Sequence, residues 1–232
     1  MSRTLHVLCA GAVQGLVRAV QARFQEQTGA VVEARFGAVG AMKEALMCGV
    51  PCDVLIVTDA MLRALVANGA VDAEALAAIG SVRTGVAVRA GDAVPRVDSA
   101  DALSAALLAA PALYVPDIVK STAGAHVASM LDRLGIREAL APRLAIFANG
   151  ATAMAALAEA GAPAALGCTQ ISEILYAPGL ALAGGLPKPL DLTTAYSAGV
   201  SRTSNDASLA ASFIAVLCGA ETAALREAGG ID

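Results

Sequence analysis

Short apolar segments alternate with helical segments along almost the whole chain, and this alternation limits the fold more than any other feature. Residues 5–9 and 52–57 are apolar runs, residues 31–36 are a further expected strand, and residues 13–27 carry apolar side chains at helical spacing. Turns rich in Gly and Ala follow residues 5–9 and 31–36. Strands that are joined through helices pair in parallel and need cover on both faces of the sheet. The sequence therefore predicts an α/β fold.

A second series of the same kind follows. Its expected strands are residues 85–88, 112–115, 144–147 and 164–169, and its expected helices are residues 100–108, 151–160 and a helix ending at residue 134. The tail differs, because a single strand at residues 196–200 precedes an amphipathic stretch at residues 207–228. A strand and helices after a complete second series most simply return to complete the first.

We therefore expect two lobes. One consists of residues 1–83 with 196–232, and the other of residues 84–195. Residues 84–89 and 196–200 are the expected hinge strands between them.

The composition excludes several classes of function. Hydrophobic residues make up 57% of the chain and aromatic residues only 3%, so the core must consist of Ala, Val, Leu and Ile. The net charge of -4 and the absence of a basic cluster argue against nucleic acid as a partner. The sequence contains no stretch of about 18 apolar residues, so we expect no insertion into a membrane. The sequence lacks a phosphate loop, a histidine-rich metal cluster and a nucleophile elbow, so we expect no cofactor and no metal.

The cysteines bear on location. Five cysteines occur in apolar segments without the spacing of a zinc site, which favours buried thiols in a reducing compartment. We expect Cys9, Cys52 and Cys168 to be buried and free. The first residues also lack the apolar region of a signal peptide. These features predict a cytoplasmic protein, or a periplasmic one if a leader was removed.

Small and polar residues follow the expected strands, where open α/β sheets bind their ligands. In the first lobe these residues are Ala10, Gly11, Ala12, Gly37, Val39, Gly40 and Thr58. In the second lobe they are Lys120, Ser121, Thr122, Asn149, Gly150, Thr152, Thr169, Gln170 and Ser172. Free backbone N–H groups and the helix dipole attract negative charge there, so we expect a small anionic ligand. In the simpler interpretation the glycines serve turn geometry and Ser121 or Thr122 caps a helix.

Three titratable side chains lie at or near such a site. Lys120 lies beside a helix start, where its charge would pair with a carboxylate. His126 lies one helical turn after Thr122, and Glu173 follows the expected strand at residues 164–169. The sequence does not choose between Lys120, His126 and Glu173.

These motifs resemble the molybdate-binding branch of the type II periplasmic solute-binding proteins, which have the two-lobed Venus-flytrap fold. The resemblance covers almost the whole chain and rests on residues 10–12, 36–40, 52–59 and 196–200. It implies two lobes, each a mixed, mostly parallel sheet flanked by helices, that close around a small ligand. Molybdate-binding members use hydroxyl side chains where this chain has Ala12 and Val39 or Gly40, which argues against a tetrahedral oxyanion.

Residues 166–174, with Pro-Gly at 178–179 and Gly-Gly-Leu-Pro at 184–187, are more similar to a divergent branch that includes aconitate isomerases. This resemblance implies a di- or tricarboxylate ligand and an isomerase that shifts a proton on it, with Lys120, His126 or Glu173 as the candidate base. The alternative is a non-catalytic binding protein for molybdate or another oxyanion, with an ABC transporter as its partner.

Overall fold

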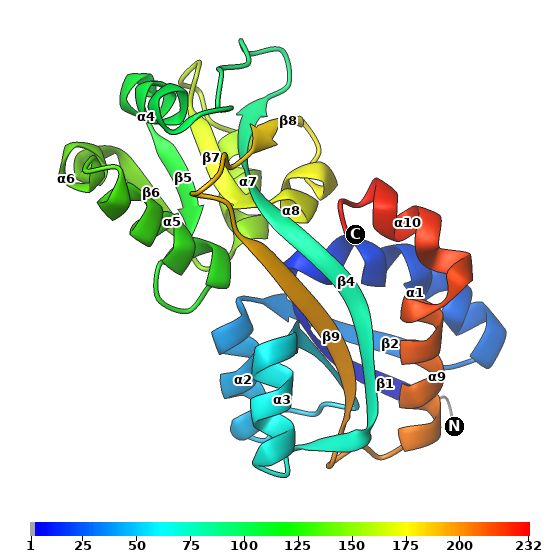
Figure 1. The fold of residues 1–232 in the computed structure, drawn as a ribbon. Helices are drawn as coiled ribbons and strands as arrows, with labels where there is room; N and C mark the ends of the chain where they lie inside the picture. Colours follow the sequence, from blue (N-terminus) through cyan, green and yellow to red (C-terminus); the bar gives the residue numbers. More distant parts are fainter. Residues whose placement is uncertain (1–2) are drawn as a thin grey trace. The chain divides into compact units, whose positions relative to one another are not determined.

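Figure 1 shows a computed structural model of the chain, which describes residues 3–232. The described residues form two compact units. Unit 1 contains the residues up to Ser81 together with Thr194–Asp232, and unit 2 contains Val82–Thr193. The chain passes from unit 1 to unit 2 within strand β4 (Val71–Arg89) and returns at the start of strand β9 (Thr193–Ser201). That residues 84–89 and 196–200 act as hinges stays a prediction.

Unit 1 is built on a mixed sheet. Its strands follow the order β2 (Val31–Gly37), β1 (Thr4–Ala10), β3 (Val54–Thr58), β9 and the first part of β4. Strand β1 is parallel to both β2 and β3, whereas β9 is antiparallel to β3. The helical elements are η1 (Gly11–Val13), α1 (Gln14–Thr28), α2 (Val39–Met47), α3 (Asp59–Ala67), α9 (Ala207–Cys218), η3 (Ala220–Thr222) and α10 (Ala223–Ala228).

The core of unit 1 joins the two ends of the sequence. Helices α1 and α9 pack against each other, as Figure 1 shows. Their buried rings Phe24 and Phe213 meet edge to face at 4.9 Å between centroids. Such pairs add to the stabilisation that burial of the rings already provides. Helix α9, near the end of the chain, is therefore part of the core of unit 1.

Unit 2 has its own mixed sheet. Its strands follow the order β8 (Leu180–Gly185), the last part of β4, β7 (Leu166–Gln170), β5 (Leu113–Pro116) and β6 (Leu144–Phe147). Strands β5, β6 and β7 are parallel, and β4 is antiparallel to β7 and β8. The helical elements are α4 (Ala100–Ala109), α5 (Thr122–Arg133), α6 (Arg137–Leu140), η2 (Ala141–Arg143), α7 (Gly150–Ala158) and α8 (Ile171–Tyr176).

Helices cover both faces of this second sheet. Val86 pairs with Cys168, and both belong to the cluster that includes the apolar side chains of α4 and α5. Ala87 on the opposite face belongs to the cluster of α7 and α8. The α/β fold class is therefore confirmed. None of the helices in residues 3–232 is by itself long and apolar enough to cross a membrane; only the bent pair α9 and α10 meets those limits together.

Two strands were not expected from the sequence, and one expected helical stretch is divided. Residues 71–81 form the first part of β4, although their Ala and Glu content disfavours strands. Strand β8 consists only of Leu, Ala and Gly. Both strands form because a neighbouring strand pairs with them. The stretch at residues 207–228 is interrupted at Gly219, where φ and ψ are extended.

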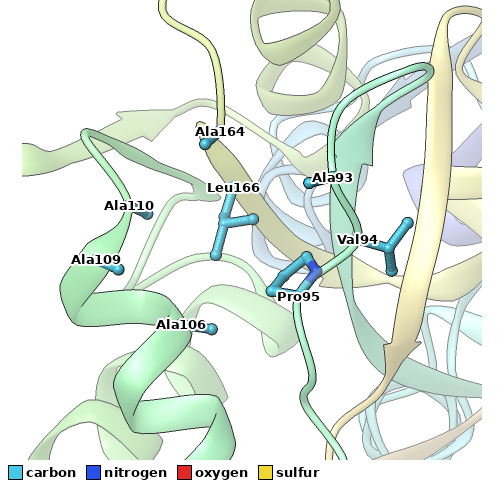
Figure 2. A pocket seen from close by; sticks show the side chains of 8 residues that line it. All are labelled: Ala93, Val94, Pro95, Ala106, Ala109, Ala110, Ala164 and Leu166. Atoms are coloured by element: carbon cyan, nitrogen blue, oxygen red, sulfur yellow. The ribbon is translucent and has the colours of Figure 1, made fainter.

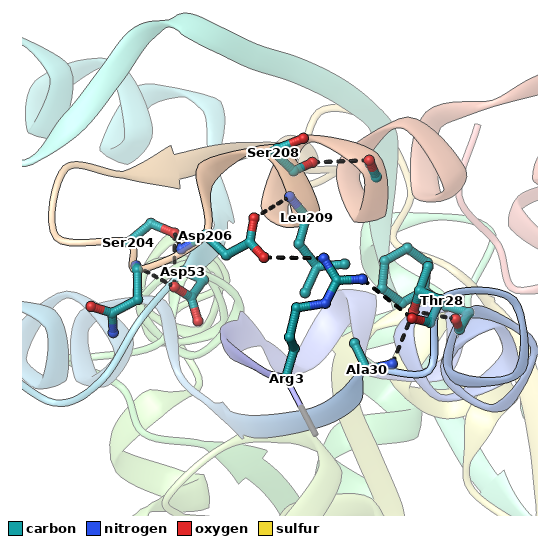
Figure 3. Close-up of polar contacts among 11 residues, drawn as sticks. Arg3, Thr28, Ala30, Asp53, Ser204, Asp206, Ser208 and Leu209 are labelled. Atoms are coloured by element: carbon teal, nitrogen blue, oxygen red, sulfur yellow. Dashed lines mark hydrogen bonds and ion pairs between the residues drawn. The ribbon is translucent and has the colours of Figure 1, made fainter. Parts of the chain in front are cut away.

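Asp53 connects the start of the first strand to the loop before α9. Figure 3 shows its contact with Ser204 in that loop. Its buried carboxylate accepts hydrogen bonds from the His6 backbone N–H at 2.8 Å, the Ser204 hydroxyl at 2.7 Å and the Asn205 backbone N–H at 3.0 Å. Burial is the largest single influence on its pKa and acts to raise it, but these hydrogen bonds together lower the pKa below its ordinary value. The ionised form is therefore the one the fold stabilises.

Replacing Asp53 should destabilise unit 1. Asp53→Ala leaves buried N–H and O–H donors without an acceptor, and we expect the free energy of unfolding at pH 7 to fall by about 2–4 kcal/mol. Because the folded-state pKa is lowered, this difference should shrink as the pH falls below about 4 and the wild-type carboxylate is protonated. Urea unfolding at several pH values measures it. Asp132→Ala, which removes a surface pair with Arg137, is the control and should leave the midpoint unchanged.

The cysteines lie where the sequence predicted. All five are free thiols, and Cys9, Cys52 and Cys168 are buried. Burial raises the pKa of Cys52 and of Cys168 to about 12, so these thiols stay protonated and unreactive at neutral pH. Cys48 is exposed. The expectation that these three thiols are buried and unpaired is confirmed, although Cys52 precedes β3 and is not part of a strand.

Candidate functional site

Two turns in unit 1 lie side by side at the carboxyl edge of its sheet. Ala10 ends β1 and Gly37 ends β2, and the two residues are partners in the parallel register. Each turn leads directly into a helical element, η1 or α2, and the N-cap residues Ala10 and Ala38 make no side-chain cap. The first N–H groups of a helix have no partner within the helix. These turns therefore present backbone donors that no capping side chain occupies.

The side chains at these turns are small. Ala10, Ala12 and Ala38 are buried, and Val39 at the start of α2 is also buried. A Cβ on Gly37 would lie 2.7 Å from the end of the Met42 side chain. Gly11 and Gly40 complete the set predicted in this unit, at the first position of η1 and the second of α2. The structure thus brings six of the seven predicted residues of unit 1 into two adjacent turns.

In the third predicted turn of unit 1, the side chains of the turn already have hydrogen-bond partners within the protein. The Thr58 hydroxyl accepts a hydrogen bond from the Met61 backbone N–H at 3.3 Å and so caps α3. The next residue, Asp59, accepts from Arg63 at 2.7 Å and from the Ser197 hydroxyl at 2.9 Å. The hydrogen bond from Arg63 is the main reason that the pKa of Asp59 is lowered. The Asp59 carboxylate is therefore held in its ionised form and is paired with Arg63.

Two turns of unit 2 are also capped from within. The Ser121 hydroxyl accepts from the Gly124 backbone N–H at 3.4 Å at the start of α5, next to Thr122. Asn149 and Thr152 form a reciprocal capping box at the start of α7. Ser121 thus has the capping role that the simpler interpretation gives it, and Asn149 and Thr152 cap α7 in the same way.

Lys120 and His126 occupy different surroundings. Lys120 is exposed, and its backbone N–H donates to the Asp117 carboxylate at 2.9 Å. The His126 ring lies on α5, where its Nε2 is 2.8 Å from the Leu190 carbonyl oxygen. A ring nitrogen at that distance from a carbonyl carries the proton, so this nitrogen is a donor with a structural partner.

Of the three proton-transfer candidates, only Glu173 is buried. The Thr169 hydroxyl donates to Glu173 Oε2 at 2.5 Å, and the Gln170 backbone N–H also donates to the carboxyl. Glu173 stands at the third position of α8, from which such a residue reaches back to the helix start. The carboxyl also lies against Gly150 at the start of α7. Thus the structure brings Gly150, Thr169, Gln170 and Glu173 together.

Burial raises the pKa of Glu173 to about 7, against the weaker, lowering influence of the hydrogen bonds from Thr169 and Gln170. No charged side chain contributes to the shift. A carboxyl that titrates near neutral pH can both accept and donate a proton under ordinary conditions. Glu173 therefore has the protonation behaviour of a general acid or base.

Two buried hydroxyls in unit 2 have no hydrogen-bond partner in the structure. One is Ser172 on α8, which the sequence predicted as a ligand contact, and the other is Thr84 on β4, which it did not. Thr84 is the register partner of Gln170. A lone threonine in an apolar strand gives no sequence signal, so only the pairing of β4 with β7 brings it to this place.

Unit 2 also contains an apolar pocket of about 220 Å³. Figure 2 shows that small apolar side chains surround it, among them Pro95, Ala106 and Leu166. It contains none of the predicted site residues. An anion needs hydrogen-bond donors or positive charge, so the side chains of this pocket do not suit one.

The stability of the protein should depend on the protonation of Glu173. The carboxyl has its ordinary pKa near 4.5 when the chain is unfolded and a pKa of about 7 when it is folded. Stabilisation by the protonated form is therefore complete below the lower value and is lost as the pH rises through the higher one. Between these two pH values, the free energy of unfolding of the wild type should fall by up to about 3 kcal/mol relative to that of Glu173→Gln. Denaturant unfolding of both proteins from pH 4.5 to 8.5, with about half-unit steps, measures the difference. A constant difference would contradict the raised pKa.

The chain belongs to the family of bacterial extracellular solute-binding proteins, whose sequence model matches residues 5–232. It is 27% identical over 235 residues to an aconitate isomerase of Pseudomonas sp, covering 98% of this chain and 87% of that protein. The periplasmic molybdate-binding protein of Azotobacter vinelandii is similar in structure, with a TM-score of 0.81 at 18% identity over 98% of each chain. The sulfate-binding protein SubI of Mycobacterium tuberculosis has a TM-score of 0.74 at 17% identity, covering 99% of this chain and 86% of that one.

These likenesses confirm the periplasmic-binding-protein fold and the resemblance to its molybdate-binding branch. The family is described as extracellular, which fits the periplasmic alternative for location and gives no support to the cytoplasmic one. A small anionic ligand is consistent with this family, whereas an ABC transporter as partner stays a prediction.

Proposed function

We propose that this protein binds a small di- or tricarboxylate and shifts a proton on it. The observation that carries the proposal is the pair of adjacent turns at Ala10 and Gly37, whose backbone donors no side chain caps. Two parallel strands direct these donors toward the same edge of the sheet. Backbone N–H groups at helix starts are well suited to anionic oxygens.

A carboxylate suits these turns better than a tetrahedral oxyanion does. Ala12, Val39 and Gly40 offer no side-chain hydroxyl, so the donors from unit 1 are backbone groups alone. A planar carboxylate needs fewer donors than an oxyanion with four oxygens. The likeness to an aconitate isomerase supports the same class of ligand.

Glu173 is the group proposed to move the proton. As a carboxylate it would take a proton from a carbon next to a carboxylate or a double bond of the ligand, leaving a delocalised carbanion. As a carboxylic acid it would return that proton to the carbon at the other end of the delocalised system. The double bond moves, atoms and electrons balance, and no other reagent is consumed. Its pKa of about 7 supports both halves of this exchange.

The remaining predicted residues of unit 2 have supporting roles in the proposal. The exposed charge of Lys120 would attract the carboxylate, and the Ser172 hydroxyl has its full hydrogen-bonding capacity available. Ser121, Thr122, Asn149, Gly150 and Thr152 would form the surroundings of the ligand through the starts of α5 and α7. Lys120 and His126 stay alternatives to Glu173 as the base, although His126 is already bonded to Leu190.

The proposed binding of an anion by the turns at Ala10 and Gly37 can be tested by removing one backbone N–H donor. Val39 is the first residue of α2 and follows Ala38 with an extended ψ of 149°, so proline fits there without disturbing the helix. Val39→Pro should weaken binding of trans-aconitate by about ten- to a hundredfold, the value of one hydrogen bond to a charged group. Isothermal titration calorimetry measures this. Ala100→Pro makes the same change at the first position of α4 and should leave the affinity unaltered.

Catalysis is tested separately from binding. Wild-type protein in deuterated water should interconvert cis- and trans-aconitate or exchange a carbon-bound proton of either acid for deuterium, as followed by proton NMR. Glu173→Gln keeps the shape of the side chain but cannot take up a proton, so it should bind trans-aconitate and lose at least about a hundredfold in the exchange rate. Binding without exchange by the wild type would favour the non-catalytic alternative. Tight binding of molybdate or sulfate, with none of trans-aconitate, would contradict the carboxylate proposal.

A further inference from the structure

We propose that Gly150 is a positioning residue that holds the Glu173 carboxyl at the start of α7 and thereby sets its proton transfer. The inference rests on the proposed function of Glu173. It gives Gly150 a different role from the one predicted from the sequence, which was to present its backbone to the ligand.

The Glu173 carboxyl occupies the space that a side chain at position 150 would need. A Cβ at this position would lie 1.9 Å from Glu173 Oε2, 2.3 Å from Glu173 Cδ and 2.4 Å from the Thr169 hydroxyl oxygen. No real Cβ is found at such distances, so even alanine would displace the carboxyl or the helix start. Gly150 is the first residue of α7 and does not have a positive φ. Its backbone conformation is open to any residue, and contact with Glu173 is therefore the reason that this position must be glycine.

Opposing influences act on the protonation of the Glu173 carboxyl at this place. The start of α7 and the hydrogen bonds from Thr169 and Gln170 favour the ionised form, whereas burial favours the neutral form. The elements packed most against α8 are α7, β7 and β8. They carry no charged side chain, and their one titratable group is Cys168, which burial keeps protonated. On α8 itself the other titratable group is Tyr176, which is exposed.

A purely structural interpretation makes a different prediction. If Gly150 serves only close packing, Gly150→Ala changes stability and leaves the titration of Glu173 where it was. If Gly150 positions the carboxyl, the added methyl group displaces the carboxyl from its buried place. The proton affinity of Glu173 then returns toward that of an ordinary glutamate.

The first test measures the titration of Glu173 directly in the protein without ligand. The carboxyl signal is observed by carbon-13 NMR in protein labelled at glutamate and is assigned by its absence in Glu173→Gln. In Gly150→Ala the midpoint should fall by at least about one pH unit. Gly161→Ala is the matched control, because a Cβ at Gly161 meets nothing within 4 Å. An unchanged midpoint in Gly150→Ala would overturn the inference.

A double variant gives the second test. Asp is one methylene shorter than Glu, so Glu173→Asp makes room for the methyl group of Gly150→Ala. The rate of proton exchange on trans-aconitate should fall at least about tenfold in Gly150→Ala. The rate of the double variant should be higher than the rate expected from multiplying the effects of the two single substitutions. Strict additivity of the two effects would count against the inference.

The outcomes separate the two proposals. If the wild type does not exchange trans-aconitate protons but the midpoint still falls in Gly150→Ala, the catalytic role of Glu173 is wrong and the positioning by Gly150 stands. If Gly150→Ala does not fold, Thr169→Val provides the titration test. It removes a hydrogen bond to the same carboxyl and should raise the midpoint, whereas an unchanged midpoint would contradict the proposed contact network.

Discussion

The parallel pairing of β1 with its two neighbours is the constraint on which the candidate site depends. Register fixes Ala10 beside Gly37, and Cys9 beside Ile56 two residues before β3 ends. Because all these strands run in one direction, their turns emerge at one edge and their helices begin there. Unit 2 repeats the rule with β5, β6 and β7. Strand direction and register thus place several helix starts at one edge of each sheet.

What each helix start can do depends on its cap. Thr58, Ser121 and Asn149 use their side chains on the first N–H groups of α3, α5 and α7, which stabilises the fold and reduces the donors left for a ligand. Ala10 and Ala38 leave those donors uncapped. The uncapped helix starts lose the stabilisation of a cap, about 1 kcal/mol for each helix. Their occurrence on two adjacent strands is therefore more informative than either turn alone.

The sequence predicts the α/β class and most strands because apolar runs and helical spacing are local signals. It does not predict β8 or the first part of β4, since alanine-rich segments become strands only through pairing with a neighbour. The turns at Ala10 and Gly37 could be predicted from their composition. The burial of Glu173, its contact with Gly150 and the position of Thr84 opposite Gln170 could not, because they depend on how α7, α8 and β4 pack.

Two buried carboxyls show how the same chemical group receives opposite roles. Asp53 accepts bonds from backbone and hydroxyl donors at both oxygens, and these outweigh burial, so that its pKa is lowered and its charge becomes part of the fold. Glu173 accepts fewer hydrogen bonds, and burial prevails. A carboxyl kept near its own titration point contributes less to stability at neutral pH than a fully bonded one. Such a group is expected where proton transfer is needed, which is the physical basis for placing the chemistry at Glu173 and the structural role at Asp53.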